Sequence, residues 1–329
     1  MCFIVQVLCI CMIKKLNKNL FLIYFLYLMS ISKVVTVIPT FFTPSGVIDY
    51  PMVCVHINRQ ILNNIKSIVI LGTTSEAPTL SQHERIVFAH HIFKTFSDKI
   101  NITVGLGGNN TAEMIEEIKQ LDDISHNIMI SQPAYNKPTQ EGIYQHFKAL
   151  IDASTKPIII YNIPSRCGVN IEPTTVQRIG TYSDRVVGIK EASGNLDQIM
   201  TIKDICPNLL IWSGDDNLVL PVLSVGGYGV ISVVSNVVPR LMGNIVFAFE
   251  SGNVKSAYEL FYTIKSLIKM CFIESNPVPV KYILSLEKNE PTMEYVRLPL
   301  VTLSDQSKEI IKICVKNMKN FQNSEEQFA

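Results

Sequence analysis

Eight short apolar runs recur along the chain, and they constrain its fold more than any other feature of the sequence. Each run is rich in Val and Ile and nearly continuous, which is typical of strands buried on both faces. Successive runs begin roughly 20 to 35 residues apart, the spacing of repeated βα units. The runs lie at residues 34–38, 67–71, 101–105, 127–130, 157–161, 186–190, 209–213 and 229–233.

Amphipathic segments suited to helices lie between these runs, for example at residues 111–121 and 141–151. Eight βα units in succession predict an α/β fold, a (β/α)₈ TIM barrel. A doubly wound sheet also uses parallel strands, but no GxGxxG motif opens a helix after the first run. The GLGG of residues 105–108 lacks that spacing, and we interpret it as a tight turn.

The pattern changes near residue 253, where long amphipathic segments replace the short runs. Residues 254–272 and 305–321 predict helices, and the prolines of 276–281 predict a break between them. We therefore expect a catalytic barrel over residues 29–252 and a C-terminal helical domain over residues 253–329.

Residues 1–28 form a separate N-terminal extension, in which a basic stretch separates two apolar stretches. Neither apolar stretch reaches the ~18 residues that a membrane-spanning helix needs. The pattern resembles the start of a signal peptide. The alternative is that translation begins at Met29. We expect a cytoplasmic protein without a membrane partner, with targeting through this extension as the alternative.

Charge and cysteine content exclude several classes of function. The chain has 29 basic and 28 acidic residues, a net charge of +1, so a nucleic-acid partner is not expected. Its eight cysteines include no CxxC pair and its six histidines no HExxH motif, so we expect no metal site and reduced thiols.

The sixth run ends in Lys190, within the stretch VVGIKEASGNL of residues 186–196. Burying an ammonium group costs several kcal/mol unless the group is paired or loses its proton. One interpretation is a strand end that reaches solvent. The other is an amine kept partly neutral so that it can attack a carbonyl group.

Further polar residues follow the other runs, at the end of a barrel where active sites are built. Each has an ordinary explanation as a helix cap, a wall residue or a solvated charge. Together with Lys190 they suit Schiff-base chemistry on an α-keto acid, with a tyrosine transferring protons and an arginine holding a carboxylate. They are Thr73, Thr74, Tyr135, Tyr161 and Arg166.

Seven stretches resemble the motifs of the dihydrodipicolinate synthase family, in its order and at similar spacing, from about Met29 to about residue 315. They are GTTSEAPTL (72–80), YNKPTQEGIYQHFKAL (135–150), YNIPSRCGVNI (161–171), GIKEASGNL (188–196), SGDD (213–216), GVISV (229–233) and NPVPVK (276–281). The resemblance implies a (β/α)₈ barrel with a C-terminal helical domain, usually as a homotetramer. It implies condensation of pyruvate with aspartate 4-semialdehyde, on the way to lysine and diaminopimelate, with no cofactor.

The resemblance also implies roles for individual residues. Lys190 matches the Schiff-base lysine and Tyr161 the general acid and base. Thr73 and Tyr135 match a proton relay, in which the family's second tyrosine crosses a subunit interface to the neighbouring site. The implied substrate-binding residues are Thr74, Ile231, Arg166 and Gly214.

Several positions depart from the family's pattern. Ser75 replaces the usual Gly, so a positive φ there would strain the turn, and Cys167 stands where Thr is common. Asn109 and Glu113 match the family's lysine-feedback pocket. However, three residues differ from those of the inhibited bacterial enzymes, and we expect weak or absent inhibition by lysine. These three are Gln82, Arg85 and Ala134.

Two other functions stay open. Related Schiff-base enzymes, such as N-acetylneuraminate lyase or a keto-deoxy sugar acid aldolase, share the lysine but generally lack the counterparts of Arg166 and Tyr135. A catalytically inactive barrel that serves as a binding protein would retain the fold but would not need the catalytic side chains. The intact set of polar residues favours the synthase over both alternatives.

Overall fold

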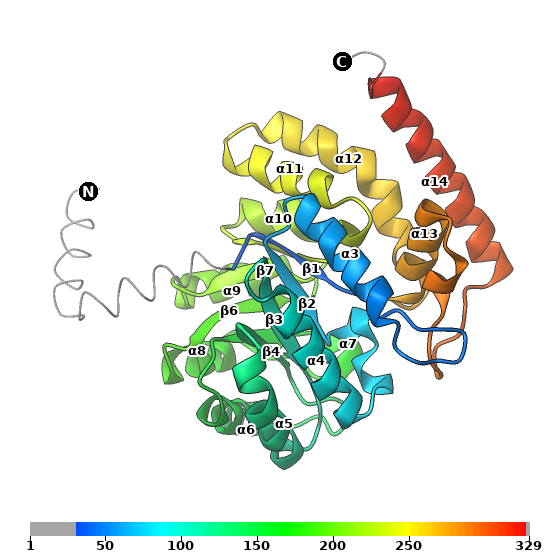
Figure 1. The fold of residues 1–329 in the computed structure, drawn as a ribbon. Helices are drawn as coiled ribbons and strands as arrows, with labels where there is room; N and C mark the ends of the chain where they lie inside the picture. The colour runs from blue at the N-terminus through cyan, green and yellow to red at the C-terminus, as the bar shows by residue number, and fades with distance from the viewer. Residues whose placement is uncertain (1–30, 327–329) are drawn as a thin grey trace.

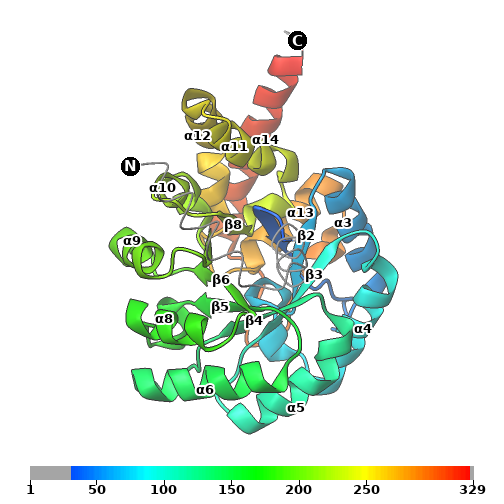
Figure 2. The same ribbon diagram turned by 90° about the vertical axis from the view of Figure 1, so that its left-hand side faces the viewer.

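The computed structural model describes residues 31–326, with side chains described through residue 317. Within that range, eight parallel strands close a barrel in chain order, β1 to β8, which confirms the predicted fold (Figure 2). The strands are β1 (Val34–Val37), β2 (Ser67–Ile70), β3 (Asn101–Leu106), β4 (Asn127–Ser131), β5 (Ile158–Asn162), β6 (Val186–Glu191), β7 (Leu210–Ser213) and β8 (Gly229–Ser232).

Alternate residues of each strand face the barrel interior and the surrounding helices. In β5, Ile158 and Ile160 pack in the large core between strands and helices, whereas Ile159 and Tyr161 belong to a smaller cluster inside the barrel. This period of two follows from strand geometry. The near-continuous apolar runs therefore arise because both faces of every strand are buried.

A ring of helices covers the barrel (Figures 1 and 2). The predicted helix at 111–121 is found with those bounds, and the one at 141–151 is one residue longer at its start and two at its end. The helices between strands, and the one that follows β8, are α3 (Tyr50–Leu62), α4 (Gln82–Phe96), α5 (Thr111–Leu121), α6 (Gln140–Ala153), α7 (Pro164–Cys167), α8 (Pro173–Tyr182), α9 (Leu196–Ile205), α10 (Val219–Ser224) and α11 (Pro239–Glu250).

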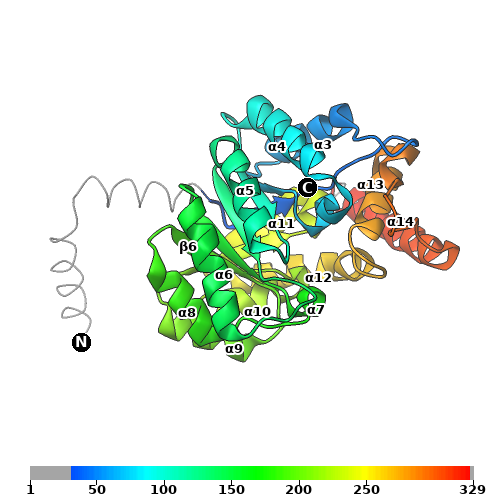
Figure 3. The ribbon, with the colours of Figure 1, turned by 90° about the horizontal axis from the view of Figure 1, so that it is seen from below.

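Three further α-helices follow α11 in the described chain: α12 (Val254–Met270), α13 (Val278–Lys288) and α14 (Asp305–Glu326). The predicted break at 276–281 is wrong in part, because α13 begins within it and carries Pro279 in its first turn. Proline is tolerated there because the first amides of a helix have no partner within the helix. Figures 1 and 3 place α13 at the same end of the barrel as α7, the end where the strands finish.

The predictions for residues 1–28 lie outside the described residues. Among residues 31–326, no helix combines the length and apolar character needed to cross a bilayer. The cysteines within this range are all free thiols, and of these Cys167 and Cys271 are buried.

Candidate functional site at the carboxyl ends of the strands

Lys190 and Tyr161 lie side by side at the carboxyl ends of β6 and β5, where they are partners in the strand register. Both side chains point into the barrel, and only 5% of Lys190 is exposed. The Lys190 Nζ lies 4.3 Å from the centroid of the Tyr161 ring. The interpretation of Lys190 as a strand end that reaches solvent is therefore wrong.

The surroundings of Lys190 favour its neutral form. Its pKa is lowered from the ordinary value of 10.5 to about 8, chiefly by burial, and the nearby Arg166 guanidinium acts in the same direction. The carboxylates of Asp216 and Asp215 act in the opposite direction. With a pKa of about 8, roughly one lysine in ten is neutral at pH 7. A fraction of Lys190 is therefore neutral and able to act as a nucleophile, although its side chain is almost completely buried.

Glu191 follows Lys190 directly but points to the opposite face of β6. Its carboxylate accepts hydrogen bonds from Asn162 Nδ2 at 3.0 and 3.2 Å, from the Ser193 amide at 2.7 Å and from Gln198 Nε2 at 3.2 Å. These partners hold the carboxylate outside the barrel. The alternation of the strand thus keeps the adjacent acid away from the lysine.

Tyr161 is linked to the turn that follows β2 through a hydrogen bond with the Thr73 side chain. Burial raises the pKa of the Tyr161 phenol well above its ordinary value, and this hydrogen bond and Arg166 only partly oppose that effect. The phenol therefore stays protonated near neutral pH and can donate a proton. This geometry suits a general acid next to an amine.

The turn after β2 forms the short helix η1 (Thr73–Ser75), and its backbone differs from what the sequence suggested. Positive φ values lie on either side of η1, at Leu71 and Glu76, both +56°, and Ser75 is not among the residues with positive φ. Ser75 is buried, and its Oγ donates to the Ile38 carbonyl at 2.6 Å. The strain expected at Ser75 is therefore absent, and the serine instead attaches the turn to the chain after β1.

Asn276, from the segment before α13, joins two of the predicted residues. Its Nδ2 donates to Thr74 Oγ1 at 3.0 Å, and its backbone carbonyl accepts a hydrogen bond from Arg166 Nη2 at 3.5 Å. The Asn276 Oδ1 is buried and has no hydrogen-bond partner among the described residues. We did not predict a role for Asn276. Its only signal in the sequence is its place in the NPVPVK motif.

Gly214 directly follows β7, and Ile231 lies in β8. The Gly214 amide donates to the Glu191 carbonyl at 2.7 Å, and a Cβ at position 214 would lie 2.5 Å from that of Ala192. Ile231 is fully buried in the cluster inside the barrel that also contains Tyr161. Position 214 therefore needs glycine for close approach.

Tyr135 is the predicted residue that this chain does not bring to Lys190. Its side chain is 89% exposed, and its backbone has a φ of +71°. Its amide donates to the Cys167 carbonyl at 3.3 Å, which attaches the loop to α7. The tyrosine ring thus extends away from the body of its own chain.

A cavity of about 430 Å³ extends from the site toward α4 and α5. Thr73, Tyr161 and Arg166 line one part of it. The other part is lined by residues that include Asn109, Ala134, Arg85 and Glu117.

Arg85 and Glu117 form a bidentate ion pair in that second part of the cavity. Arg85 Nε and Nη2 donate to the Glu117 oxygens at 2.6 and 2.7 Å. The predicted Glu113 is instead exposed in the first turn of α5, as Gln82 is in that of α4. Sequence reasoning missed Glu117, although it lies one helical turn after Glu113 on the same helix.

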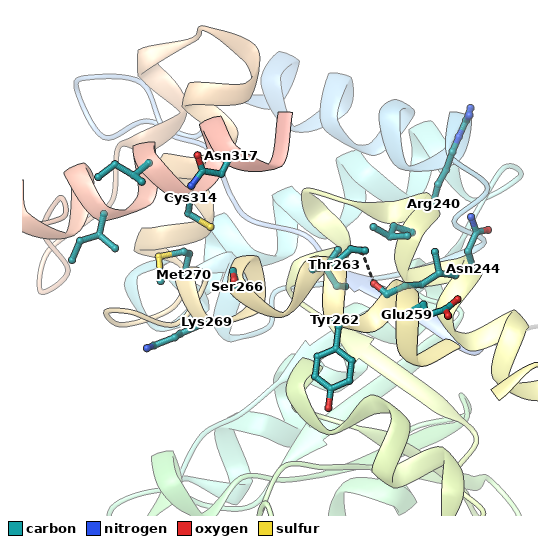
Figure 4. Close-up of a pocket in the computed structure, with 15 residues that line it drawn as sticks. Arg240, Asn244, Glu259, Tyr262, Thr263, Ser266, Lys269, Met270, Cys314 and Asn317 are labelled. Atoms are coloured by element: carbon teal, nitrogen blue, oxygen red, sulfur yellow. Dashed lines mark hydrogen bonds between the residues drawn. The ribbon is translucent and has the colours of Figure 1, made fainter. Parts of the chain in front are cut away.

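A larger hollow, of about 920 Å³, lies apart from this site between α11, α12 and α14 (Figure 4). Its walls combine aliphatic residues with polar ones, which include Arg240, Glu259 and Lys269. None of the polar residues predicted from the sequence lines it within the described chain. Residues 31–326 also hold no cluster of three or more His, Cys, Asp or Glu side chains suited to a metal ion.

The chain matches the family model described as the dihydrodipicolinate synthetase family over residues 30–318. It is 38% identical over 294 residues to 4-hydroxy-tetrahydrodipicolinate synthase 1 of Halalkalibacterium halodurans, covering 89% of this chain and 99% of the relative. The synthase structure from Methylacidiphilum fumariolicum is similar with a TM-score of 0.86 and 38% identity, over 90% of this chain and 99% of that one. The dihydrodipicolinate synthase structure of Thermotoga maritima is similar with a TM-score of 0.84 and 35% sequence identity, and the match covers 88% of this chain and 99% of that one.

The lowered pKa of Lys190 predicts when its amine reacts. Because the neutral fraction rises as the pH passes through about 8, labelling of Lys190 by a small acylating reagent should reach half its maximal rate near that pH. Asp216→Asn removes a carboxylate that raises this pKa, so its midpoint should lie at lower pH. Peptide mass spectrometry measures both, with the exposed Lys255 as internal reference. A midpoint near 10.5 would contradict the assignment.

Proposed function

We propose that this chain, which belongs to the dihydrodipicolinate synthetase family, is a 4-hydroxy-tetrahydrodipicolinate synthase that condenses pyruvate with L-aspartate 4-semialdehyde. The observation that carries the proposal is the buried amine of Lys190 beside Tyr161, at the carboxyl ends of the strands. Its pKa of about 8 supports a nucleophilic role. The names of the relatives support the choice of substrates.

In the first half of the reaction, the neutral Lys190 amine attacks C2 of pyruvate and forms a carbinolamine. Tyr161 donates a proton to the departing oxygen, which leaves as water when the C=N bond forms. The hydrogen bond between Thr73 and Tyr161 supports a path for returning that proton. The raised pKa of the phenol is consistent with Tyr161 acting as the acid in this step.

In the second half, the protonated imine draws electrons from the methyl carbon of pyruvate, which loses a proton to the Tyr161 oxygen that gave up its own proton in the first half. The resulting enamine carbon attacks the aldehyde of the second substrate and forms the new carbon–carbon bond. The amino group of the condensed semialdehyde then attacks the imine carbon, which closes the ring and displaces the Lys190 amine, so that the cyclic product is released and the lysine is regenerated. Burial of the imine favours these steps because charge interactions are stronger away from bulk water.

Substrate binding is assigned to residues around this pair. Thr74 and the backbone of its turn are proposed to hold the pyruvate carboxylate, with Ile231 and Gly214 as walls. Arg166 is proposed to hold the carboxylate of the semialdehyde, because a guanidinium group can bind a carboxylate with two hydrogen bonds. Its contact with Asn276 supports a fixed position near Thr74.

The proposal includes a homotetramer, built as a dimer of dimers, in the cytoplasm. The exposed ring of Tyr135 supports it, because this tyrosine can enter a proton relay only at the site of a neighbouring subunit. We also propose that the catalytic barrel covers residues 29–252 and the helical domain residues 253–329. The end of α11 at Glu250 and the start of α12 at Val254 support this boundary.

Two substitutions test the chemistry directly. Pyruvate with borohydride should add one reduced pyruvate to Lys190, and Lys190→Ala should abolish this adduct. Tyr161→Phe should keep the fold but lower kcat by a factor of about 10² or more, because it removes the proton donor. Intact and peptide mass spectrometry measure the adduct, and a coupled assay with aspartate 4-semialdehyde measures kcat.

The outcomes of that assay separate the alternatives. No adduct with the unaltered chain would contradict Schiff-base chemistry and favour an inactive barrel. An adduct without semialdehyde turnover, together with cleavage of a sialic or keto-deoxy acid, would instead indicate a related lyase. Lys255→Ala is a matched control because this lysine is exposed on α12, and it should change neither quantity.

Weak or absent inhibition by L-lysine is also expected. The part of the cavity that contains Asn109 holds the Arg85–Glu117 ion pair, so a cationic side chain would meet the Arg85 guanidinium there. An inhibition curve in the low millimolar range measures this effect. Strong inhibition over that range would overturn the prediction.

A further inference from the structure

We infer that the Glu76–Lys281 ion pair is a positioning device by which the C-terminal helices hold the Thr73–Thr74 turn in its working geometry. The inference rests on the proposed function, because it concerns how these threonines are placed for the reaction. Neither Glu76 nor Lys281 contacts the site directly. Each is therefore a positioning residue, and the evidence lies in their contacts and burial.

The ion pair is completely enclosed. The Lys281 Nζ lies 2.7 Å from Glu76 Oε1, and both side chains are 0% exposed. The same ammonium donates to the Thr40 carbonyl at 2.8 Å and lies 4.6 Å from the centroid of the Phe42 ring. A buried pair is not by itself strong evidence of stabilisation, because desolvation offsets much of the attraction. The location of the pair, directly after the Thr73–Thr74 turn, instead indicates a role in positioning that turn.

Glu76 immediately follows η1 and has a left-handed backbone with a φ of +56°. Residues with a Cβ rarely adopt this conformation, and they keep it where the surrounding structure enforces it. Its second oxygen, Oε2, accepts a hydrogen bond from the Arg297 amide at 3.0 Å. Lys281 and Arg297, both from the C-terminal part of the chain, thus bind the Glu76 carboxylate at the end of the turn.

Arg297 extends this attachment beyond Glu76. Its guanidinium donates to the Glu84 carboxylate at 2.6 and 3.0 Å and to the Thr79 carbonyl at 3.0 Å. Glu84 belongs to the capping box at the start of α4. The segment from the catalytic turn to α4 is therefore fixed at both ends by the residues after α12.

The segment that carries Lys281 also reaches the site itself. Lys281 lies in the first turns of α13, five positions after Asn276, whose side chain donates to Thr74 Oγ1. One short segment therefore contacts the turn at Thr74 and, through the ion pair, at Glu76. A displacement of about 1 Å at a catalytic group can cost a factor of about 10² in rate, so this attachment is suited to control kcat.

Two variants test the inference while keeping the fold. Glu76→Asp retains both charges but shortens the acid by one methylene group. The double variant Glu76→Gln/Lys281→Met removes both charges of the pair, so no buried charge is left unpaired. Removing only one of the two would leave an uncompensated buried charge, which is strongly destabilising. In both variants we expect kcat to fall about tenfold or more and KM for pyruvate to rise, because Thr73 and Thr74 move.

Glu287→Gln is the matched control. It removes another ion pair between the barrel and α13, the one that Arg59 of α3 makes with Glu287 at 2.7 Å, but this pair does not contact the turn. We expect kcat and KM within twofold of the unaltered chain. Melting temperatures identify folded samples, and the amount of borohydride-trapped pyruvate counts active sites.

If either folded variant keeps kcat per trapped site and KM at the values of the control, the inference is overturned and the pair is only structural. A lower melting temperature with unchanged kinetic constants would overturn it as well. Failure of the proposed function is recognised separately, since the unaltered chain would then trap no pyruvate before any variant is compared.

Discussion

The burial of one lysine inside the barrel is the constraint on which the rest of the site depends. Removing an ammonium group from water is unfavourable, so Lys190 loses part of its charge, and its pKa falls to about 8. The same enclosure raises the pKa of Tyr161 and keeps its proton in place. The pKa values of this amine and this phenol thus shift in opposite directions from one physical cause, the exclusion of water.

The position of this pair depends on elements far apart in the chain. Strand alternation turns Lys190 and Tyr161 inward and Glu191 outward, while the turn after β2 brings Thr73 to the tyrosine. Asn276 and Lys281 then connect that turn with the C-terminal helices. We therefore regard these helices as part of the catalytic unit, because they contact the residues that would bind substrate.

The strands could be predicted from the sequence because double burial leaves a direct signature in the apolar runs. Lys190 and Tyr161 could be placed because each ends such a run. Contacts between distant segments left no comparable signal. Lys281 and Glu76 are 205 positions apart, and nothing local to either indicates the other.

The strain expected at Ser75 is absent because the positive φ values of this turn lie at Leu71 and Glu76, and distant partners hold Glu76 in place. The described cavity is lined by Glu117, which pairs with Arg85, whereas Glu113 is exposed on the same helix. The exposed Tyr135 ring extends away from its own chain.

The most direct measurement is a crystal structure of the chain grown or soaked with pyruvate. The account predicts continuous electron density between Lys190 Nζ and C2 of pyruvate, with the carboxylate against Thr74 and the Tyr161 hydroxyl beside the new bond. Pyruvate bound elsewhere, or an unmodified Lys190 beside an ordered pyruvate, would contradict it.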